Sequence, residues 1–507
     1  MKKQSAREAK PLWAWTLLAL AALLVIAVRL RLASFPLERD EGEYAWIGSG
    51  LLNGIAPYLH AYTMKMPGID TVYALAMAMG GRSVTAIRVA LLLANLLTMG
   101  AIVAIGRRLW DDAAGAVAAA AYGVMALSIS LMGFAAHATH FVVLFVVAGL
   151  LLLLRERWFT AGILFGVAIT MKQHGAAFAL MPLVLRRNER KWGLPPVLFI
   201  AGVLTPLAVL AVALAAAGAF PKFWFWNVIY ASSYARGSTL AEGVANLAYQ
   251  LRLMAPLAGF AVVAAGGFIA SRNRLVLALL AASVLAILPG LYFRNHYFIQ
   301  MLPAVALAVG IGVAVAARRF GSGAGVALFV ACAGLSIGHD ATLLFSASPV
   351  AFSRTVYGSN PFPEAVDVAA WIRAHTAPTD TIAVLGSEPE IYFYAGRPAA
   401  TGYLYMYGLL EEQPHAQAMQ TEMTAEIEAA KPTIIVAVNV SLSWLLREGS
   451  VNKIFAWAEN YIALDYDEVG LVEIGEGASK PIWGADAAGT IPGAENYLLI
   501  YRRKPGV

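Results

Sequence analysis

The stretch FPLERDEGEYAWIGSGLLNGIAPYLHAYTMKMPG, residues 35–68, lies between two strongly apolar runs of the chain. It carries four acids and one nearby lysine, namely Glu38, Asp40, Glu41, Glu43 and Lys65. Loops that join membrane spans rarely hold this much charge without a function. We therefore expect the segment around it, residues 33–83 (the 33–83 loop), to be a functional loop.

The composition predicts a polytopic α-helical membrane protein. The chain has 507 residues, of which 60% are hydrophobic and 13% charged, whereas a soluble protein carries about 25% charged residues. The single cysteine, Cys332, excludes a disulfide within the chain. The first apolar run ends in Val-Arg-Leu-Arg without a small-residue cleavage site, so we expect an anchor rather than a signal peptide.

Apolar runs of the length needed to cross a bilayer recur along the first two thirds of the chain. We expect eleven spans, at 12–32, 84–105, 113–132, 136–154, 158–171, 174–185, 194–217, 251–270, 275–292, 297–317 and 324–345. The fifth and sixth are short, so they either form a V whose tip holds residues 171–174 or make one long tilted helix.

Lys and Arg in the short loops predict the orientation. With the N-terminus in the cytoplasm, every cytoplasmic segment is basic: MKKQSAREAK, GRRLW, RERW, RRNERKW, SRNR and ARRF. The 33–83 loop, residues 218–250 and residues 293–296 are then extracytoplasmic. The basic clusters are explained by this topology, so no nucleic-acid binding is expected.

The composition changes near residue 350, where apolar runs shorten and charges return. We expect a transmembrane domain at 1–349 and an extracytoplasmic α/β domain at 350–507 (the C-terminal α/β domain). Its expected helices and strands follow from their hydrophobic periodicity. The helices are 363–376 and 424–430, and the strands are 381–387, 433–439 and 497–503.

Within the 33–83 loop, the spacing predicts a short helix that begins near Asp40 and ends at Asn53-Gly54, with another beginning at Pro67. Asp40 shares a helical face with Glu43 and Tyr44, which lie three and four residues on. One alternative is that the acids form a solvated helix start, favoured by the helix dipole. The other is that they serve an anionic ligand together with Lys65.

Further candidates lie at other predicted outer positions. Lys172 is costly inside a membrane, which favours a function. Arg294, beside His296 and Tyr297, either binds phosphate or anchors a helix end at the interface.

Two other pairs have a functional and a structural interpretation. His137 and His140 are spaced for metal ligation, although two neutral packed histidines are the favoured alternative. Glu388 and Glu390 are either sugar contacts or a solvated loop, and we favour the loop.

Several motifs together resemble the GT-C fold glycosyltransferases, especially the protein-mannosyltransferase-like and aminoarabinose-transferase-like enzymes of bacterial membranes. The 33–83 loop is similar to their first outer loop, with Arg-Asp-Glu-Gly-Glu-Tyr-Ala, then Gly-Ile-Ala-Pro-Tyr, then Lys-Met-Pro-Gly. GVAITMKQHGAAFALMPL (166–183), RNHYFIQMLPAVAL (294–307) and residues 380–397 resemble further family segments in the same order.

This resemblance implies transfer of a sugar from a polyprenyl-phosphate carrier to a glycan, lipid or protein acceptor outside the cytoplasm, at the bacterial plasma (inner) membrane. Asp40 is the implied general base, with Glu41 second. Lys65 is the implied contact to the donor phosphate. We also expect Arg294 and Lys172, which the topology places on the outer side, to bind the phosphate. The expected substrate contacts are Glu43, Tyr44, Tyr58, His296 and Tyr297. The chemistry agrees, because an attacking hydroxyl needs a base and a leaving phosphate needs cations.

The chain departs from the family pattern at three places, one of which is AHATH (136–140), where the family often has an acid near the outer end of the fourth span. Met66 stands where the family often has Pro, and Met64 stands where one branch has a metal-binding acid. The lack of that acid argues against a metal beside Lys65, whereas a divalent cation with His137 and His140 as candidate ligands stays open as a cofactor. The alternatives to an enzyme are a lipid-linked-sugar transporter or flippase, and a non-catalytic cell-envelope assembly protein.

Overall fold

The computed structural model describes residues 11–185, 194–234, 237–477 and 479–506. The predicted basic segments at 1–10 and 186–192 lie outside these residues. The chain forms two compact units. Unit 1 comprises Met1–Ala33, Arg88–Ala211 and Tyr234–Phe345, and unit 2 comprises Ser34–Ile87, Val212–Ser233 and Ser346–Val507.

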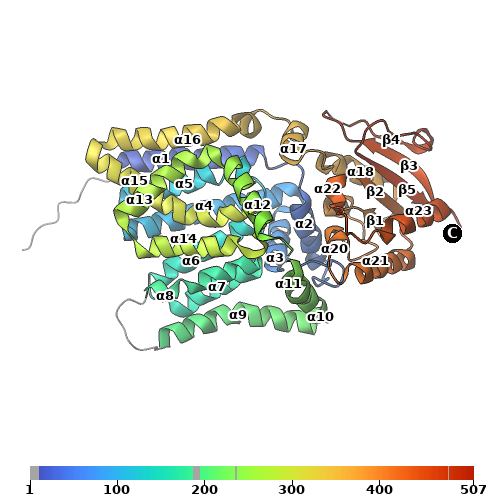
Figure 1. Ribbon diagram of the computed structural model, residues 1–507, viewed down its shortest axis with the longest axis horizontal. Helices are drawn as coiled ribbons and strands as arrows, with labels where there is room; N and C mark the ends of the chain where they lie inside the picture. Colours follow the sequence, from blue (N-terminus) through green and yellow to red (C-terminus); the bar gives the residue numbers. More distant parts are fainter. Residues whose placement is uncertain (1–10, 186–193, 235–236, 478, 507) are drawn as a thin grey trace, which may run out of the picture. The chain divides into compact units, whose positions relative to one another are not determined.

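Unit 1 is helical in its described residues, and α4 and α9 carry the chain from one unit into the other (Figure 1). Its elements are α1 (Leu12–Arg31), α4 (Val84–Leu109), α5 (Asp112–Met125), η1 (Ile129–Leu131), α6 (Ala138–Leu153), α7 (Trp158–Met171), η2 (Gln173–Leu180), α8 (Pro182–Leu185), α9 (Leu194–Ala216), α12 (Leu240–Leu253), η4 (Ala255–Leu257), α13 (Ala258–Ser271), α14 (Arg274–Ile287), η5 (Pro289–Leu291), η6 (Asn295–Met301), α15 (Leu302–Phe320) and α16 (Ser322–Phe345).

The described helices confirm a multi-pass membrane protein. Five of them are long and apolar enough to cross a bilayer, or six if the bent pair Leu240–Leu253 and Ala255–Ser271 is one span. Four more predicted spans correspond to apolar helices of 10–17 residues, which are α5, α6, α7 and α14. The predicted total of eleven spans stays a prediction, because the shorter helices do not reach the length of an upright span.

The chain turns back at the Met-Lys-Gln-His segment, as the V interpretation predicted. Lys172 has extended backbone angles, φ −160° and ψ 137°, between α7 and η2. A Cβ on Gly175 would lie 2.7 Å from the Ala168 carbonyl oxygen, so η2 packs closely against α7. The alternative of one long tilted helix is wrong, because the helical hydrogen bonding stops at Lys172.

Unit 2 combines the 33–83 loop, the aromatic-rich residues 220–233 and the C-terminal α/β domain. Its elements are α2 (Arg39–Leu52), α3 (Gly68–Gly80), α10 (Phe220–Trp224), the π-helical η3 (Phe225–Tyr230), α11 (Ala231–Tyr234), α17 (Pro349–Tyr357), α18 (Phe362–His375), β1 (Ile382–Leu385), α19 (Pro389–Ala395), α20 (Tyr407–Leu410), α21 (Ala416–Ala430), β2 (Ile434–Asn439), α22 (Ser441–Trp444), α23 (Lys453–Asp465), β3 (Tyr466–Glu473), β4 (Ile482–Trp483), η7 (Gly484–Asp486) and β5 (Tyr497–Arg503). The α/β prediction is confirmed, whereas the domain boundary at residue 350 stays a prediction.

A five-stranded sheet of order β1-β2-β5-β3-β4 forms the centre of the C-terminal α/β domain (Figure 1). β1 and β2 are parallel, and the other neighbouring pairs are antiparallel. Alternate residues of β1 face opposite sides, since Ile382 and Val384 pack with α18 and α19, while Ala383 and Leu385 pack with α21. The sheet is therefore covered by helices on both faces.

The 33–83 loop takes part in the hydrophobic core beneath this sheet. Ile47 of α2 is 5% exposed and belongs to the same cluster as α18, α19 and the strands. Trp46 packs against this cluster from α2 as well. Helix α2 is thus held by the core of the C-terminal α/β domain, which gives its N-terminal residues a fixed place in unit 2.

Candidate functional site

A capping box begins helix α2, directly before Asp40. The Glu38 carboxylate accepts a hydrogen bond from Glu41 N at 2.9 Å, and the Glu41 carboxylate accepts one from Glu38 N at 3.5 Å. Such reciprocal bonds satisfy amides that a helix start leaves without partners. Glu41 is fully buried and Glu43 is 1% exposed. The interpretation of these two acids as a solvated helix start is therefore wrong.

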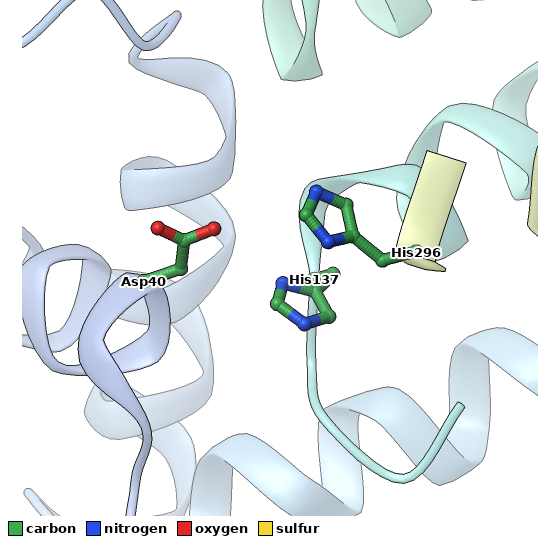
Figure 2. A group of neighbouring side chains, drawn as sticks. All are labelled: Asp40, His137 and His296. Atoms are coloured by element: carbon green, nitrogen blue, oxygen red, sulfur yellow. The ribbon is translucent and has the colours of Figure 1, made fainter. Parts of the chain in front are cut away.

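Lys65 lies between the two carboxylates that share one face of α2 (Figure 2 shows Asp40 on its helix). Its Nζ is 2.6 Å from Asp40 Oδ1 and 2.5 Å from Glu43 Oε2. The ammonium also lies 4.9 Å from the ring centroid of Tyr44. The structure thus places Asp40, Glu43 and Tyr44 on one face, as the three- and four-residue spacing on α2 predicted, and Lys65 contacts all three.

The turn that carries Lys65 is fixed by its own hydrogen bonds. Tyr58 OH donates to the Lys65 carbonyl oxygen at 2.6 Å and accepts a bond from Asn227 Nδ2 at 3.1 Å. Lys65 N donates to Thr63 Oγ1 at 3.2 Å. Tyr58 is fully buried and reaches this position with a positive φ of 69°. Tyr58, predicted as a substrate contact, here supports the lysine turn.

Burial shapes the charge of this cluster. Burial raises the pKa of Glu43, although the nearby Lys65 works in the opposite direction. Burial and the Glu43 charge also raise the pKa of Asp70 well above its ordinary value. For Lys65, burial lowers the pKa, but Asp40 and Glu43 outweigh it and keep the amine charged. The cluster therefore holds one firmly charged ammonium beside Glu43, a carboxyl that burial makes harder to ionise.

Tyr405 of the C-terminal α/β domain also contacts Asp40. Its hydroxyl donates to Asp40 Oδ1 at 2.6 Å and accepts a bond from Lys65 Nζ at 3.1 Å. The Tyr405 ring lies 4.4 Å from the ammonium. Sequence analysis missed this residue, because it stands 365 positions from Asp40 and no local motif marks it.

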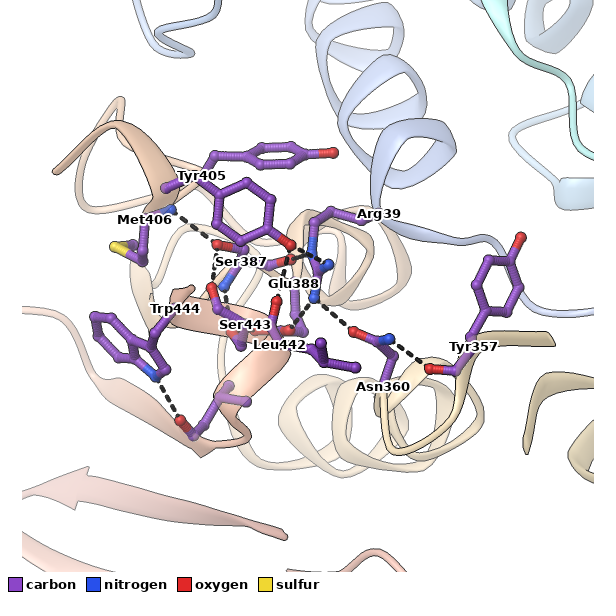
Figure 3. A network of polar contacts seen from close by, with 12 residues as sticks. Arg39, Tyr357, Asn360, Ser387, Glu388, Tyr405, Met406, Leu442, Ser443 and Trp444 are labelled. Atoms are coloured by element: carbon purple, nitrogen blue, oxygen red, sulfur yellow. Dashed lines mark hydrogen bonds and ion pairs between the residues drawn. The ribbon is translucent and has the colours of Figure 1, made fainter. Parts of the chain in front are cut away.

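Arg39, also missed from the sequence, binds the C-terminal α/β domain at several points (Figure 3). Its Nη2 lies 2.9 Å from both Glu388 Oε1 and Asn360 Oδ1. It also donates to the Ser387 carbonyl and the Tyr407 hydroxyl. The only sequence signal for Arg39 was its position beside Asp40.

The predicted solvated loop at Glu388 and Glu390 is wrong, since both side chains are fully buried. Glu388 is buried as the partner of Arg39, and its Oε2 accepts a bond from Ser443 Oγ at 2.7 Å. Glu390 packs at α2, where its backbone N would lie 2.6 Å from a Cβ on Gly42. A role in contacting sugar stays a prediction for both residues.

Unit 1 brings together another group of predicted residues. The rings of His137 and His296 stack with centroids 4.1 Å apart (Figure 2). Lys172 Nζ lies 3.5 Å from His296 Nε2 and 4.2 Å from the ring centroid of Tyr297. Since Lys172 sits at the break between α7 and η2, the backbone turn presents its side chain to these rings.

Two further predicted site residues of unit 1, Arg294 and His140, are close in sequence to His296 and His137. Arg294 precedes η6, and its guanidinium lies 5.6 Å from the ring centroid of Tyr292. His140 lies in the first turn of α6 and is 1% exposed, as is His137. The two histidines as joint metal ligands stay a prediction, as does phosphate binding by Arg294.

Comparison with solved structures defines the class of fold. The chain is similar to ArnT from Cupriavidus metallidurans in the apo state, with a TM-score of 0.59, 17% identity, and coverage of 96% of this chain and 97% of that one. The same protein bound to undecaprenyl phosphate gives a TM-score of 0.57 at the same identity and coverage. The oligosaccharyltransferase AglB from Archaeoglobus fulgidus, in complex with an inhibitory peptide and a dolichol-phosphate, gives 0.52 at 14% identity, over 95% of this chain and 75% of that one. The fold is that of the GT-C glycosyltransferases.

A match to a protein-family model also supports this class of fold. Residues 60–215 match the family model of dolichyl-phosphate-mannose-protein mannosyltransferase. Among curated proteins, no match was found. The resemblance to GT-C enzymes that the motifs indicated is thus confirmed, and it supports a glycosyltransferase.

Proposed function

We propose that this protein is a membrane glycosyltransferase that moves a sugar from a polyprenyl-phosphate carrier to an acceptor hydroxyl outside the cytoplasm. The observation that carries the proposal is the cluster in which Lys65 joins Asp40 and Glu43. The relatives support the donor class, since ArnT was solved with undecaprenyl phosphate and AglB with a dolichol-phosphate. The acceptor is a glycan, a lipid or a protein.

In the proposed reaction, Asp40 accepts the proton of the acceptor hydroxyl as its oxygen attacks the anomeric carbon. The bond from that carbon to the carrier phosphate oxygen breaks, and the phosphate leaves with the electron pair. The Lys65 ammonium lies 2.6 Å from Asp40 Oδ1, and a carboxylate at this place can accept the proton in the proposed reaction. Glu41 cannot share this role directly, because its carboxylate is buried in the capping box.

Lys65 is committed to protein contacts in this structure. Its ammonium contacts Asp40, Glu43 and the Tyr405 hydroxyl, and an ammonium has three N–H groups to donate. Binding of the carrier phosphate by Lys65 would replace one of these bonds. We propose that Lys172 and Arg294 supply further positive charge for the leaving phosphate.

A metal ion does not fit between Asp40 and Glu43 as they stand. The Lys65 ammonium already lies within 2.6 Å of both carboxylates and occupies the position between them. The residue before it, Met64, offers a thioether, which is a poor ligand for hard divalent cations. The proposed reaction needs no metal ion between these two carboxylates, and metal dependence stays a prediction.

The first test is transfer activity in membranes supplied with a panel of radiolabelled polyprenyl-phosphate sugars. We expect wild-type protein to transfer label, and Asp40→Asn to lower the rate by about 100-fold to 10,000-fold, the usual contribution of a general base. Asp486→Asn is the matched control, because Asp486 is an exposed carboxylate of the C-terminal α/β domain.

The outcomes separate the candidate functions. Equal rates in wild type and Asp40→Asn would remove Asp40 from catalysis. No transfer by wild type from any donor, with native membranes supplying the acceptor, would favour the transporter or the assembly protein. Retained folding of Asp40→Asn is checked by its elution from a sizing column in detergent.

A further inference from the structure

Two consecutive residues of α2 are contacted by alternate tyrosines of one segment in the C-terminal α/β domain. The Tyr405 hydroxyl donates to Asp40 Oδ1 at 2.6 Å, and the Tyr407 hydroxyl accepts a bond from Arg39. Met406 N, between the tyrosines, donates to Ser387 Oγ at 2.9 Å. The carbonyl of the same Ser387 accepts a bond from Arg39 Nε.

These contacts close a ring of bonds around the start of α2. The ring runs from Asp40 through Tyr405 and Met406 to Ser387, and returns through Arg39, which adjoins Asp40 in the chain. Figure 3 shows the Ser387 and Arg39 part of this ring. Because both ends are fixed, the Asp40 carboxylate cannot turn without breaking a bond to the domain.

We propose that the C-terminal α/β domain positions the reactive carboxylate, with Tyr405 as a positioning residue for Asp40 and Arg39 as the tether of its helix. This proposal rests on the proposed function. Tyr405 holds one carboxylate oxygen in place, and the ordered base needs less reorganisation when the acceptor arrives. The domain then contributes to the transfer reaction by fixing the orientation of the Asp40 carboxylate.

The alternative is that these bonds only stabilise the fold. A matched pair within unit 2 separates the two explanations. Arg354 pairs with Glu364, and their side chains are 12% and 2% exposed. Arg39 and Glu388 are 11% and 0% exposed. Both pairs are equally buried, but only Arg39 adjoins the proposed base.

The decisive variant is Tyr405→Phe, which removes the hydroxyl and keeps the ring that lies over Lys65. We expect kcat to fall by about 10-fold to 100-fold, as for loss of one hydrogen bond to a charged group, with the KM for the carrier changed by less than about twofold. The control is Tyr403→Phe, whose hydroxyl donates to Glu422 at 2.6 Å within the same domain. We expect Tyr403→Phe to keep the wild-type kcat.

The tether is tested with lysine variants, because lysine keeps the charge but cannot reproduce the planar set of donors. We expect Arg39→Lys to lower kcat and Arg354→Lys to leave it unchanged at equal melting temperature. An unchanged kcat in Tyr405→Phe, or equal losses in the two lysine variants, would overturn the proposal.

Hydrogen exchange separates this proposal from the proposed function. We expect the amides of residues 41–45 to exchange faster in Tyr405→Phe and Arg39→Lys, and at the wild-type rate in Tyr403→Phe and Arg354→Lys. If wild type transfers no sugar but these amides respond as expected, the domain holds α2 and only the transferase function fails. Unchanged exchange in all variants would refute the positioning itself.

Discussion

At the scale of single residues, Glu38 illustrates a carboxyl buried beside other carboxyls. It is 6% exposed, and burial followed by the charges of Asp40 and Glu41 raises its pKa from 4.5 to about 8. Between these pH values the unfolded chain has lost the proton that the folded chain keeps. Stability therefore falls as pH rises through this window, by up to about 1.4 kcal/mol per pH unit.

Glu38→Gln should remove this pH dependence, because a neutral amide resembles the protonated acid and its oxygen can still accept the bond from Glu41 N. We expect the variant and wild type to melt at similar temperatures near pH 4.5 and the variant to melt progressively higher towards pH 8. The measurement is the melting temperature in detergent across this range. Glu476→Gln, at an exposed position, is the control. A difference that does not change with pH would contradict the argument.

At the scale of elements, the contact of α2 with α19 depends on a glycine. A Cβ on Gly42 would lie 2.6 Å from Glu390 N and 2.7 Å from Glu390 Cβ, closer than real contacts allow. The contacting atoms belong to or adjoin the backbone of α19, so they cannot yield as the end of a flexible side chain would. Any larger residue must push the helices apart.

Gly42→Ala should therefore lower the free energy of unfolding by about 1 to 3 kcal/mol, despite the higher helix propensity of alanine. It should also lower transfer, because Asp40 lies on the displaced helix. The matched control is Gly50→Ala in the same helix, where the nearest atom, Ile55 Cβ, would be 3.7 Å away. There we expect a gain of about 0.5 to 1 kcal/mol. Equal effects at both glycines, measured by thermal melting, would show that α19 does not constrain α2.

Local signals predicted the elements well. The helix beginning near Asp40 spans Arg39–Leu52, and the expected strand at 433–439 spans Ile434–Asn439. The helix has acids at its start and the strand is an apolar run, and both of these local patterns are strong. β3 was missed because its sequence, YDEVGLVE, mixes acids with apolar residues, and its pairing partner β5 lies elsewhere in the chain.

The site could be predicted only where its residues are close in sequence or carry a motif. Asp40 and Glu43 share a helical face by spacing, and Lys65 stands in a recognisable turn. Tyr405 has no such signal, because its contact with Asp40 depends on how the C-terminal α/β domain packs against α2. Burial of Glu388 was likewise invisible, since its partner Arg39 lies 349 positions away.

At the scale of the whole molecule, the orientation in the membrane remains a prediction from the basic loops. It can be tested chemically because the chain has one cysteine, Cys332, which is buried and can be replaced by Ala. In that background, Ser322→Cys marks the exposed first residue of α16, close to the basic Ala-Arg-Arg-Phe segment that ends α15. Ala488→Cys marks an exposed position of the C-terminal α/β domain.

We expect a membrane-impermeant maleimide added to intact cells to label Ala488→Cys and to leave Ser322→Cys unlabelled until the membrane is opened. The reason is that arginines near membrane spans are retained on the cytoplasmic side, whereas the C-terminal α/β domain follows the last predicted span. The Cys332→Ala parent controls for background labelling. The opposite pattern would place the Asp40 cluster in the cytoplasm, because that cluster and Ala488 belong to the same compact unit. A donor and acceptor outside the cytoplasm would then be excluded.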